Sequence, residues 1–315
     1  MHITDRLNRK KWGVFHHYLY NIQNNPQFSN NQGAGETDWQ TCTAALNIPL
    51  LAKTLHQIGA GYYCITVMQG RKYMIAENAV YRQIVGDEVA DECLSKRDLI
   101  EELYQELSRY DIDLYLYFTG DGPYKDEEIG RQFGFIEPRQ NISMDFVEKW
   151  AAVLQDYALR YGDKVKGWWL DGMYQEAFGY TPELMQPYYQ AIKAGNPQAL
   201  AAFNNGVMPY LYRHYPQEEF TTGEQVDLSV FPQGRFQDGA QTHVLLPIGA
   251  DNCDIGATWA GGGLHYTKEE LCDYAEKFIA VGGVVTFDCK LNRDGSMDPE
   301  QVAALQYIGN RVKEL

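Results

Sequence analysis

Several features that mark other protein classes are missing from this sequence of 315 residues. It has no run of about 18 apolar residues, so we expect no transmembrane helix. Its first residues, MHITDRLNRKKWG, lack the apolar core of a signal peptide, so we expect a cytoplasmic location. The six cysteines form no CxxC pair and several lie inside apolar runs, which is typical neither of a disulfide framework nor of a zinc site.

Positive charge is also scarce. The formal net charge is −15, and a protein that binds nucleic acid or an anionic membrane needs clustered Lys and Arg, so we expect neither partner. Aromatic residues are abundant instead, at 13% of the chain with 23 tyrosines and 6 tryptophans. Tyr and Trp combine an apolar face with a hydrogen-bonding edge, which suits a sugar ring as well as ordinary core packing.

Several catalytic motifs are absent. No glycine-rich phosphate loop follows the first predicted strand, no GxSxG elbow occurs, and only Lys290 lies near a strand end where Schiff-base chemistry would need it. His16 and His17 are adjacent and point to opposite faces of a strand, so they do not form the alternating pair of a metal hydrolase. The stretch DNCDIG, residues 251–256, lacks the spacing of a calcium loop and is interpreted as a turn. We therefore expect no metal and no cofactor.

Short apolar or aromatic runs alternate along the chain with longer segments of helical period. This alternation predicts strands that are joined by helices, and therefore a parallel sheet. The expected strands cover residues 13–20, 62–67, 113–120, 167–172, 200–206, 243–249 and 284–288.

The longer segments carry recognisable helix starts. Ser95 is the expected N-cap of the helix in SKRDLIEELYQELSRY, and Ser143 begins the next long helical segment. Thr267 and Glu270 form a capping box, and Asp298 precedes a proline at the start of the last helix. No linker, repeat or low-complexity stretch divides the chain, so we expect one domain over residues 1–315, an irregular (β/α)8 TIM-like barrel.

In such a barrel, catalytic groups lie at the carboxyl ends of the strands. Asp171 ends the apolar run GWWLDG, and His17, Gln69, Asn204 and Glu224 stand at other predicted strand ends. An Asp-Gly pair is also common in plain turns, so Asp171 and Gly172 taken alone favour an ordinary turn at the end of the strand. The barrel changes that balance, because it places Asp171 where a nucleophile would lie.

Paired carboxylates then remain as the candidate chemistry. Glycoside hydrolysis needs one ionised carboxylate and one protonated carboxylic acid. Asp171 and Glu224 are the best pair in the sequence. Four other glutamates near possible loop ends stay open as the acid/base: Glu36, Glu176, Glu218 and Glu219.

The order of several segments resembles glycoside hydrolase family 29, the α-L-fucosidases. KWGVFHHYLYN is similar to the family's opening strand, and ETDW resembles its acidic-Trp pair. GWWLDG matches the nucleophile motif, FTTGEQ resembles FxTxEY, and the C-terminal stretch from AVGGVVTFD onward is similar to the family's last barrel segment.

The resemblance implies a retaining exo-α-glycosidase on an irregular barrel, without the β-sandwich that usually follows in the family. It implies Asp171 as the nucleophile and Glu224 as the acid/base. It also implies that the substrate, an oligosaccharide or glycoside, is bound by His17, Asp38, Trp39, Gln69 and Trp169. Plain packing remains the alternative for both tryptophans and for His17, and a loop position remains the alternative for Asp38.

The departures from the family pattern are specific. Where the family reads KHHDGF this chain reads MQGRKY, so Gln69 and Gly70 replace two sugar-binding histidines, and FNNG replaces the family's NDR motif. Because a pocket built around one hydroxyl rejects analogues that lack it, a different sugar such as an α-galactoside, an α-rhamnoside or a modified fucose is one alternative. A carbohydrate-binding protein without turnover is the second, and a metal-dependent hydrolase the third. The oligomeric state stays open.

Overall fold

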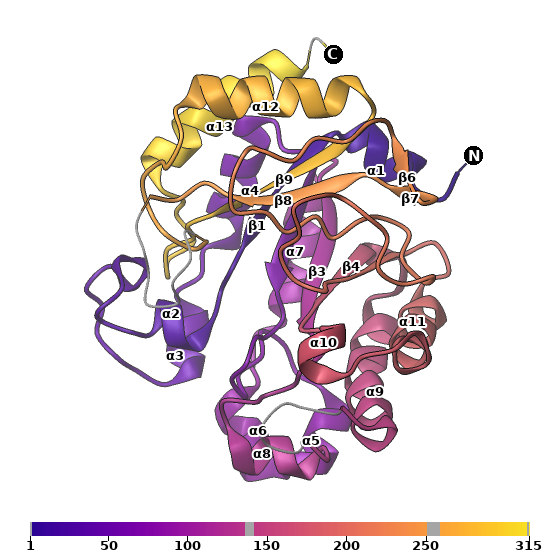
Figure 1. Cartoon of the computed structure of the whole chain (residues 1–315). Helices are drawn as coiled ribbons and strands as arrows, with labels where there is room; N and C mark the ends of the chain where they lie inside the picture. Colours follow the sequence, from indigo (N-terminus) through magenta and orange to yellow (C-terminus); the bar gives the residue numbers. More distant parts are fainter. Residues whose placement is uncertain (1, 136–141, 251–258, 314) are drawn as a thin grey trace.

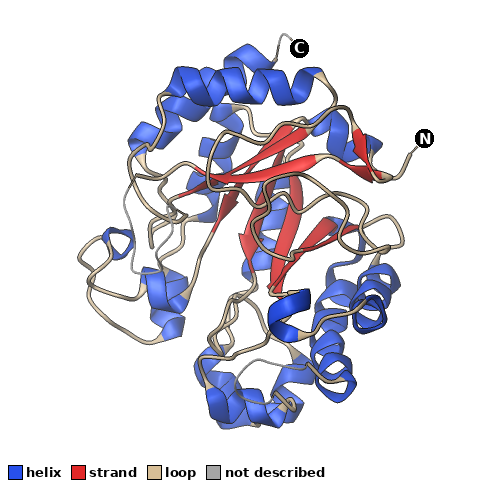
Figure 2. Ribbon diagram, viewed as in Figure 1, coloured by secondary structure: helices blue, strands red, loops and turns tan. Residues whose placement is uncertain are grey.

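The computed structural model describes residues 2–135, 142–250, 259–313 and 315. Its centre is a curled sheet of seven parallel strands in the order β5-β4-β3-β2-β1-β9-β8 (Figures 1 and 2). The strands are β1 (Trp12–His16), β2 (Tyr62–Thr66), β3 (Asp113–Thr119), β4 (Val165–Asp171), β5 (Leu200–Phe203), β8 (His243–Pro247) and β9 (Val284–Cys289). A separate hairpin pairs β6 (Phe236–Gln237) with β7 (Ala240–Gln241).

Helices return the chain between most neighbouring strands and cover the outside of the sheet (Figure 2). None of the described helices is both long and apolar enough to cross a lipid bilayer. The helices are α1 (Asp5–Lys10), α2 (Tyr20–Gln23), α3 (Trp39–Ala44), α4 (Ile48–Ile58), α5 (Ala79–Val85), α6 (Asp87–Cys93), α7 (Leu99–Ser108), α8 (Glu127–Gln132), α9 (Met144–Tyr161), α10 (Gln175–Phe178), α11 (Pro182–Gly195), α12 (Lys268–Ala280) and α13 (Pro299–Val312), with short 3-10 turns at Ser29–Asn31 and Gly162–Lys164.

Apolar periodicity explains how these elements pack. In α4, Leu51, Leu55 and Ile58 recur at helical spacing and are fully buried, so one face of the helix covers the sheet. Every residue of β2 and β3 is buried, as expected for parallel strands that have helices on one side and the barrel interior on the other. In β4 the last residue, Asp171, is only partly buried, because it faces an open cavity.

The two edges of the sheet, β5 and β8, are joined by an irregular segment, residues 219–225. The amide of Glu219 donates to the carbonyl of Ala201 in β5 at 2.9 Å. The amide of Gln225 donates to the carbonyl of Leu245 in β8 at 3.0 Å. The sheet is therefore a curled half-barrel of seven strands, consistent with a TIM-like barrel, whose open side is occupied by irregular chain.

All seven predicted strands are present in this sheet, with ends that differ by a few residues. The predicted capping box of Thr267 is confirmed, and so are the helix starts at Ser143 and Asp298. The predicted cap at Ser95 is wrong: Asp98 caps α7 by accepting a bond from the amide of Glu101, because a carboxylate nearer the first turn satisfies that donor directly. The predicted turn at 251–256 lies outside the described residues.

Gly61, just before β2, packs closely against the backbone at the end of α1. A Cβ at this position would overlap the backbone carbonyl of Lys10 at the end of α1, and a backbone atom cannot rotate away. We expect Gly61→Ala to lower the free energy of unfolding by about 1–3 kcal/mol, measured by urea unfolding. Gly234→Ala is the matched control, because an added Cβ meets no atom within 4 Å. Equal midpoints for the two variants would contradict this account.

Candidate active site

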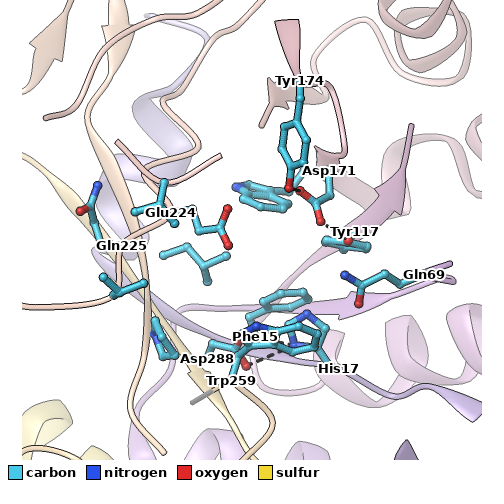
Figure 3. Close-up of a pocket in the computed structure, with 15 residues that line it drawn as sticks. Phe15, His17, Gln69, Tyr117, Asp171, Tyr174, Glu224, Gln225, Trp259 and Asp288 are labelled. Atoms are coloured by element: carbon cyan, nitrogen blue, oxygen red, sulfur yellow. Dashed lines mark hydrogen bonds and ion pairs between the residues drawn. The ribbon is translucent and has the colours of Figure 1, made fainter. Parts of the chain in front are cut away.

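A cavity of about 430 Å³ opens at the carboxyl ends of the strands (Figure 3). Residues within or soon after all seven strands of the sheet contribute to it or to its hydrogen bonds, as expected where parallel strand ends meet. Asp171 of β4 and Glu224 of the irregular segment both line it, together with His17, Gln69 and Trp169. The structure therefore brings five of the seven predicted site residues into one cavity.

Asp171 is held by three hydrogen-bond donors. The hydroxyl of Tyr117 in β3 donates to its Oδ2 at 2.6 Å. Its Oδ1 accepts from the Asn204 amide at 2.8 Å and, at the longer distance of 3.4 Å, from the hydroxyl of Tyr174. Burial and the charge of Asp171 raise the pKa of Tyr117 well above its ordinary value. The phenol therefore stays protonated and is the donor in its hydrogen bond to Asp171.

Asn204 also contacts the second carboxylate. Its side-chain nitrogen, Nδ2, donates one hydrogen to Asp171 at 2.8 Å and the other to Oε2 of Glu224 at 2.6 Å. Because both bonds start from the same nitrogen, the distance between the two accepting oxygens cannot exceed the sum of the two hydrogen-bond lengths. One neutral amide thus spaces two carboxylates inside a single cavity.

The environment of Glu224 favours its protonated form. Burial and, to a lesser extent, the charge of Asp171 together raise the pKa of this carboxyl to about 7, although the Asn204 hydrogen bond opposes the shift. The pair therefore combines one hydrogen-bonded carboxylate with one carboxyl that holds a proton near neutral pH.

His17 lies on the other wall of the cavity, paired with a third carboxylate. Its Nδ1 is 3.2 Å and 3.4 Å from the two oxygens of Asp288, the side chain that points into the cavity near the end of β9. The ring of Trp259 lies against that of His17, with centroids 4.1 Å apart. Both His17 and Asp288 are about 95% buried or more, so this hydrogen-bonded contact orients the imidazole firmly (Figure 3).

Aromatic rings form the floor between these polar groups. Phe15, Tyr117 and Trp169 stack in series, with centroid distances of 5.5 Å for each neighbouring pair. The indole nitrogen of Trp169 donates to the carbonyl of Thr222, two residues before Glu224. Trp169 thus lines the cavity, as predicted, and also fixes the segment that carries Glu224.

Gln69 reaches the cavity from the turn after β2. Its side-chain oxygen is buried and has no hydrogen-bond partner among the described residues. Gly70, the next residue, has a φ of +68°, and a Cβ there would lie 3.0 Å from the ring of Tyr124. This left-handed glycine turns the chain so that Gln69 points inward.

The ETDW motif lies elsewhere. Asp38 is exposed and caps α3 by accepting bonds from the amide and hydroxyl of Thr41. Trp39 is fully buried, and its indole nitrogen donates to the carbonyl of Met74. Neither residue lines the cavity that holds Asp171, because the helix start turns the motif away from the strand ends.

The other candidate glutamates have different surroundings. Glu218 is buried and accepts backbone amides of Phe203 and Tyr215, and Glu219 is paired with Lys193. Glu36 and Glu176 are exposed and do not line the cavity. Of the five glutamates considered, Glu224 alone lies beside Asp171.

Sequence reasoning missed three residues of the site: Tyr117, Tyr174 and Asp288. Asp288 ends the predicted strand VVTFD, which is the same signal that drew attention to Asp171. Tyr117 gave no signal, because an alternating tyrosine within a buried strand is equally typical of a core position. The described residues include no cluster of three or more potential metal ligands, and their five cysteines are buried and free.

No protein-family model and no curated protein sequence matches this chain. Solved structures do match. An endo-fucoidan hydrolase of glycoside hydrolase family 107 aligns with a TM-score of 0.69 and 15% identity over 97% of this chain and 92% of that one. The fold is that of family 107 and family 29 glycoside hydrolases. At this identity the likeness concerns the fold, and it agrees with the resemblance to family 29.

Two further neighbours are longer than this chain. A family 29 α-L-fucosidase from Bacteroides thetaiotaomicron, a covalent intermediate trapped with 2-fluoro-fucosyl fluoride in a glutamate-to-glutamine mutant, aligns with a TM-score of 0.69 and 15% identity. The alignment covers 99% of this chain and 74% of that one. Another family 107 endo-fucoidan hydrolase aligns at 0.70 and 14% identity, over 99% of this chain but about half of its own length, 54%.

The coupling between the two carboxylates can be measured directly. In Asp171→Asn the pKa of Glu224 should fall below about 7 because one negative charge is removed, and it should stay above its ordinary value because burial is the larger cause. Carbon NMR titration of labelled glutamate carboxyls would report it. Glu218, whose pKa burial raises to about 8, is the internal control and should not move. An unchanged Glu224 would contradict the proximity.

Proposed function

We propose that this chain is a retaining α-glycosidase that acts on a fucose-type sugar. The observation that carries the proposal is the amide of Asn204, which donates to both Asp171 and Glu224 at 2.8 and 2.6 Å. The short spacing that this implies suits retaining glycosidases, whose carboxyls are about 5–5.5 Å apart, better than inverting ones at about 6.5–9.5 Å.

In the first step, a carboxylate oxygen of Asp171 attacks the anomeric carbon and the glycosidic C–O bond breaks. Glu224 gives its proton to the departing oxygen, so a glycosyl-enzyme ester and a free alcohol result. Tyr117 and Asn204 hold the nucleophile by hydrogen bonds that fix its orientation before the sugar arrives.

In the second step, Glu224, now ionised, takes a proton from water, and the hydroxide attacks the anomeric carbon. The ester bond breaks and Asp171 is released as a carboxylate. A carboxyl with a pKa of about 7 suits both roles, because it is protonated in a useful fraction before the first step and is basic enough for the second.

Three of the predicted sugar-binding residues are carried into this proposal. His17, Gln69 and Trp169 line the cavity and offer an oriented imidazole, an amide and an apolar ring. Asp38 and Trp39 are not, since neither reaches it. Fucose is favoured by the names of the structural neighbours, which are fucosidases and fucoidan hydrolases. Release of a terminal sugar and a cytoplasmic location stay predictions from the sequence.

The first test compares the wild type with Asp171→Ala on 4-nitrophenyl α-L-fucoside. Removing the nucleophile should lower kcat/KM by at least about a thousandfold, because no covalent intermediate can form. Asp163→Ala is the matched control: Asp163 is an exposed aspartate just before the other end of the same strand. Turnover by neither wild type nor variant on a panel of aryl glycosides would instead favour a binding protein without turnover.

A second test concerns the acid/base. In the wild type, kcat/KM should fall as the pH rises through about 7, since Glu224 then loses the proton it donates. In Glu224→Ala this basic limb should disappear, and azide should restore the rate with an activated substrate, because the azide anion attacks the glycosyl-enzyme in place of water and needs no general base. Glu176→Ala, which alters an exposed glutamate on α10, should keep the limb. Azide rescue of Glu176→Ala in place of Glu224→Ala would reverse the assignment.

A further inference from the structure

A second cavity of about 430 Å³ lies beside the first, and the mechanism does not use it. Two aromatic side chains, Tyr20 and Tyr73, form part of its wall, and polar side chains supply most of the rest. The polar lining that matters here consists of Asn21, Glu36, Arg71 and Asp126.

Two chain segments connect the cavities. Gln69 lines the first and Arg71 the second, and two residues of chain span at most about 7 Å. In the same way His17 lines the first and Tyr20 the second, three residues later. The wall formed by His17 and Gln69 in the first cavity therefore continues within two or three residues into the wall of the second.

The second cavity also lies on a definite side of the bond that is cleaved. Gln69 and Glu224 stand on opposite sides of the first cavity, with Asp171 between them (Figure 3). An acid that protonates the leaving oxygen stands next to the leaving group. The leaving group is thus on the Glu224 side, and the second cavity extends from the opposite side, beyond the sugar that Asp171 attacks.

The wall of the second cavity has the chemistry of a sugar site. The rings of Tyr20 and Tyr73 stack with centroids 3.8 Å apart and planes 7° apart. Trp39 meets each of them edge to face at about 6 Å, which supports the pair from behind. The side-chain oxygen of Asn21 is buried and has no partner among the described residues. Rigid aromatic rings beside amide groups are typical of carbohydrate binding.

The charges of the two cavities favour an uncharged sugar. Arg71 is paired with Asp126 at 3.2 Å, and Glu36 adds a further negative charge to the second cavity. Among the described residues that line the first cavity there is no lysine and no arginine. Sulfate or carboxylate groups on the substrate would lack a free cation in either place.

We propose that the two cavities hold consecutive sugars of one chain, and that the enzyme cleaves inside an uncharged oligosaccharide. The inference rests on the proposed function and deepens it. A sugar in the second cavity is attached to the one that Asp171 attacks, on its non-reducing side, so the cleaved bond is internal. This replaces the expectation of exo action on a terminal sugar alone.

The test uses an uncharged α-linked fuco-tetrasaccharide, its sulfated form and 4-nitrophenyl α-L-fucoside, which fills only the first cavity. Wild type should release di- and trisaccharides early from the uncharged chain and cleave the sulfated chain at least about tenfold more slowly. Gln27→Trp adds bulk at an exposed residue of the second cavity. It should lower kcat/KM on the tetrasaccharide about tenfold, and leave the aryl fucoside within about twofold.

Gln198→Trp is the matched control, the same change at an exposed glutamine outside both cavities. Release of fucose alone, or equal effects of Gln27→Trp on both substrates, would overturn the inference, and faster cleavage of the sulfated chain would overturn the uncharged class. Failure to cleave any fucoside would overturn the proposed function instead. Calorimetry with the tetrasaccharide then decides: binding that Gln27→Trp abolishes supports the second site, and equal or absent binding overturns it.

Discussion

The side-chain amide of Asn204 is the contact on which the whole site depends, because it holds two carboxyl groups close together in one cavity. Two carboxylates this close repel one another, and burial strengthens the repulsion. A neutral donor with two hydrogens satisfies one oxygen of each, at 2.8 and 2.6 Å. The repulsion that remains raises the pKa of Glu224, as is required of a carboxyl that is to donate a proton.

The backbone holds that amide in place. The backbone N–H of Asn204 donates to the carbonyl of Leu170 in β4, and the backbone carbonyl of Asn204 accepts from the N–H of Met173 beyond the strand end. Glu218 anchors the other side, since its carboxyl accepts the backbone amides of Phe203 and Tyr215. A buried glutamate therefore fixes the irregular chain that leads to Glu224, where a regular strand and helix would occupy a full barrel.

The sequence predicts the strands well because each is a short apolar run, bounded by turn residues, between amphipathic helices. Asp171 could be singled out because it ends a strand, where a buried carboxylate needs a partner or a role. Glu224 lies in an irregular segment and was singled out by the resemblance of FTTGEQ to the family 29 pattern. The sequence does not show that Tyr117 and Trp39 have different surroundings in the folded protein. Both are buried aromatic residues in apolar surroundings, and only the folded structure shows that Tyr117 contacts Asp171 while Trp39 packs against Tyr73. The cap at Asp98 was missed because Ser95 offers an equally good local pattern.

The left-handed backbone at Gly70 separates this site from the family 29 pattern by its main chain as well as by its side chains. Where the resemblance to family 29 places a histidine, this chain has Gly70, with a φ of +68°. A Cβ added there would lie only 3.0 Å from the ring of Tyr124. A side chain at that point would strain the backbone and press on the ring. The difference from the α-L-fucosidase pattern thus involves the main chain, and exchanging two side chains would not reproduce that pattern unless the loop carrying Tyr124 also moved.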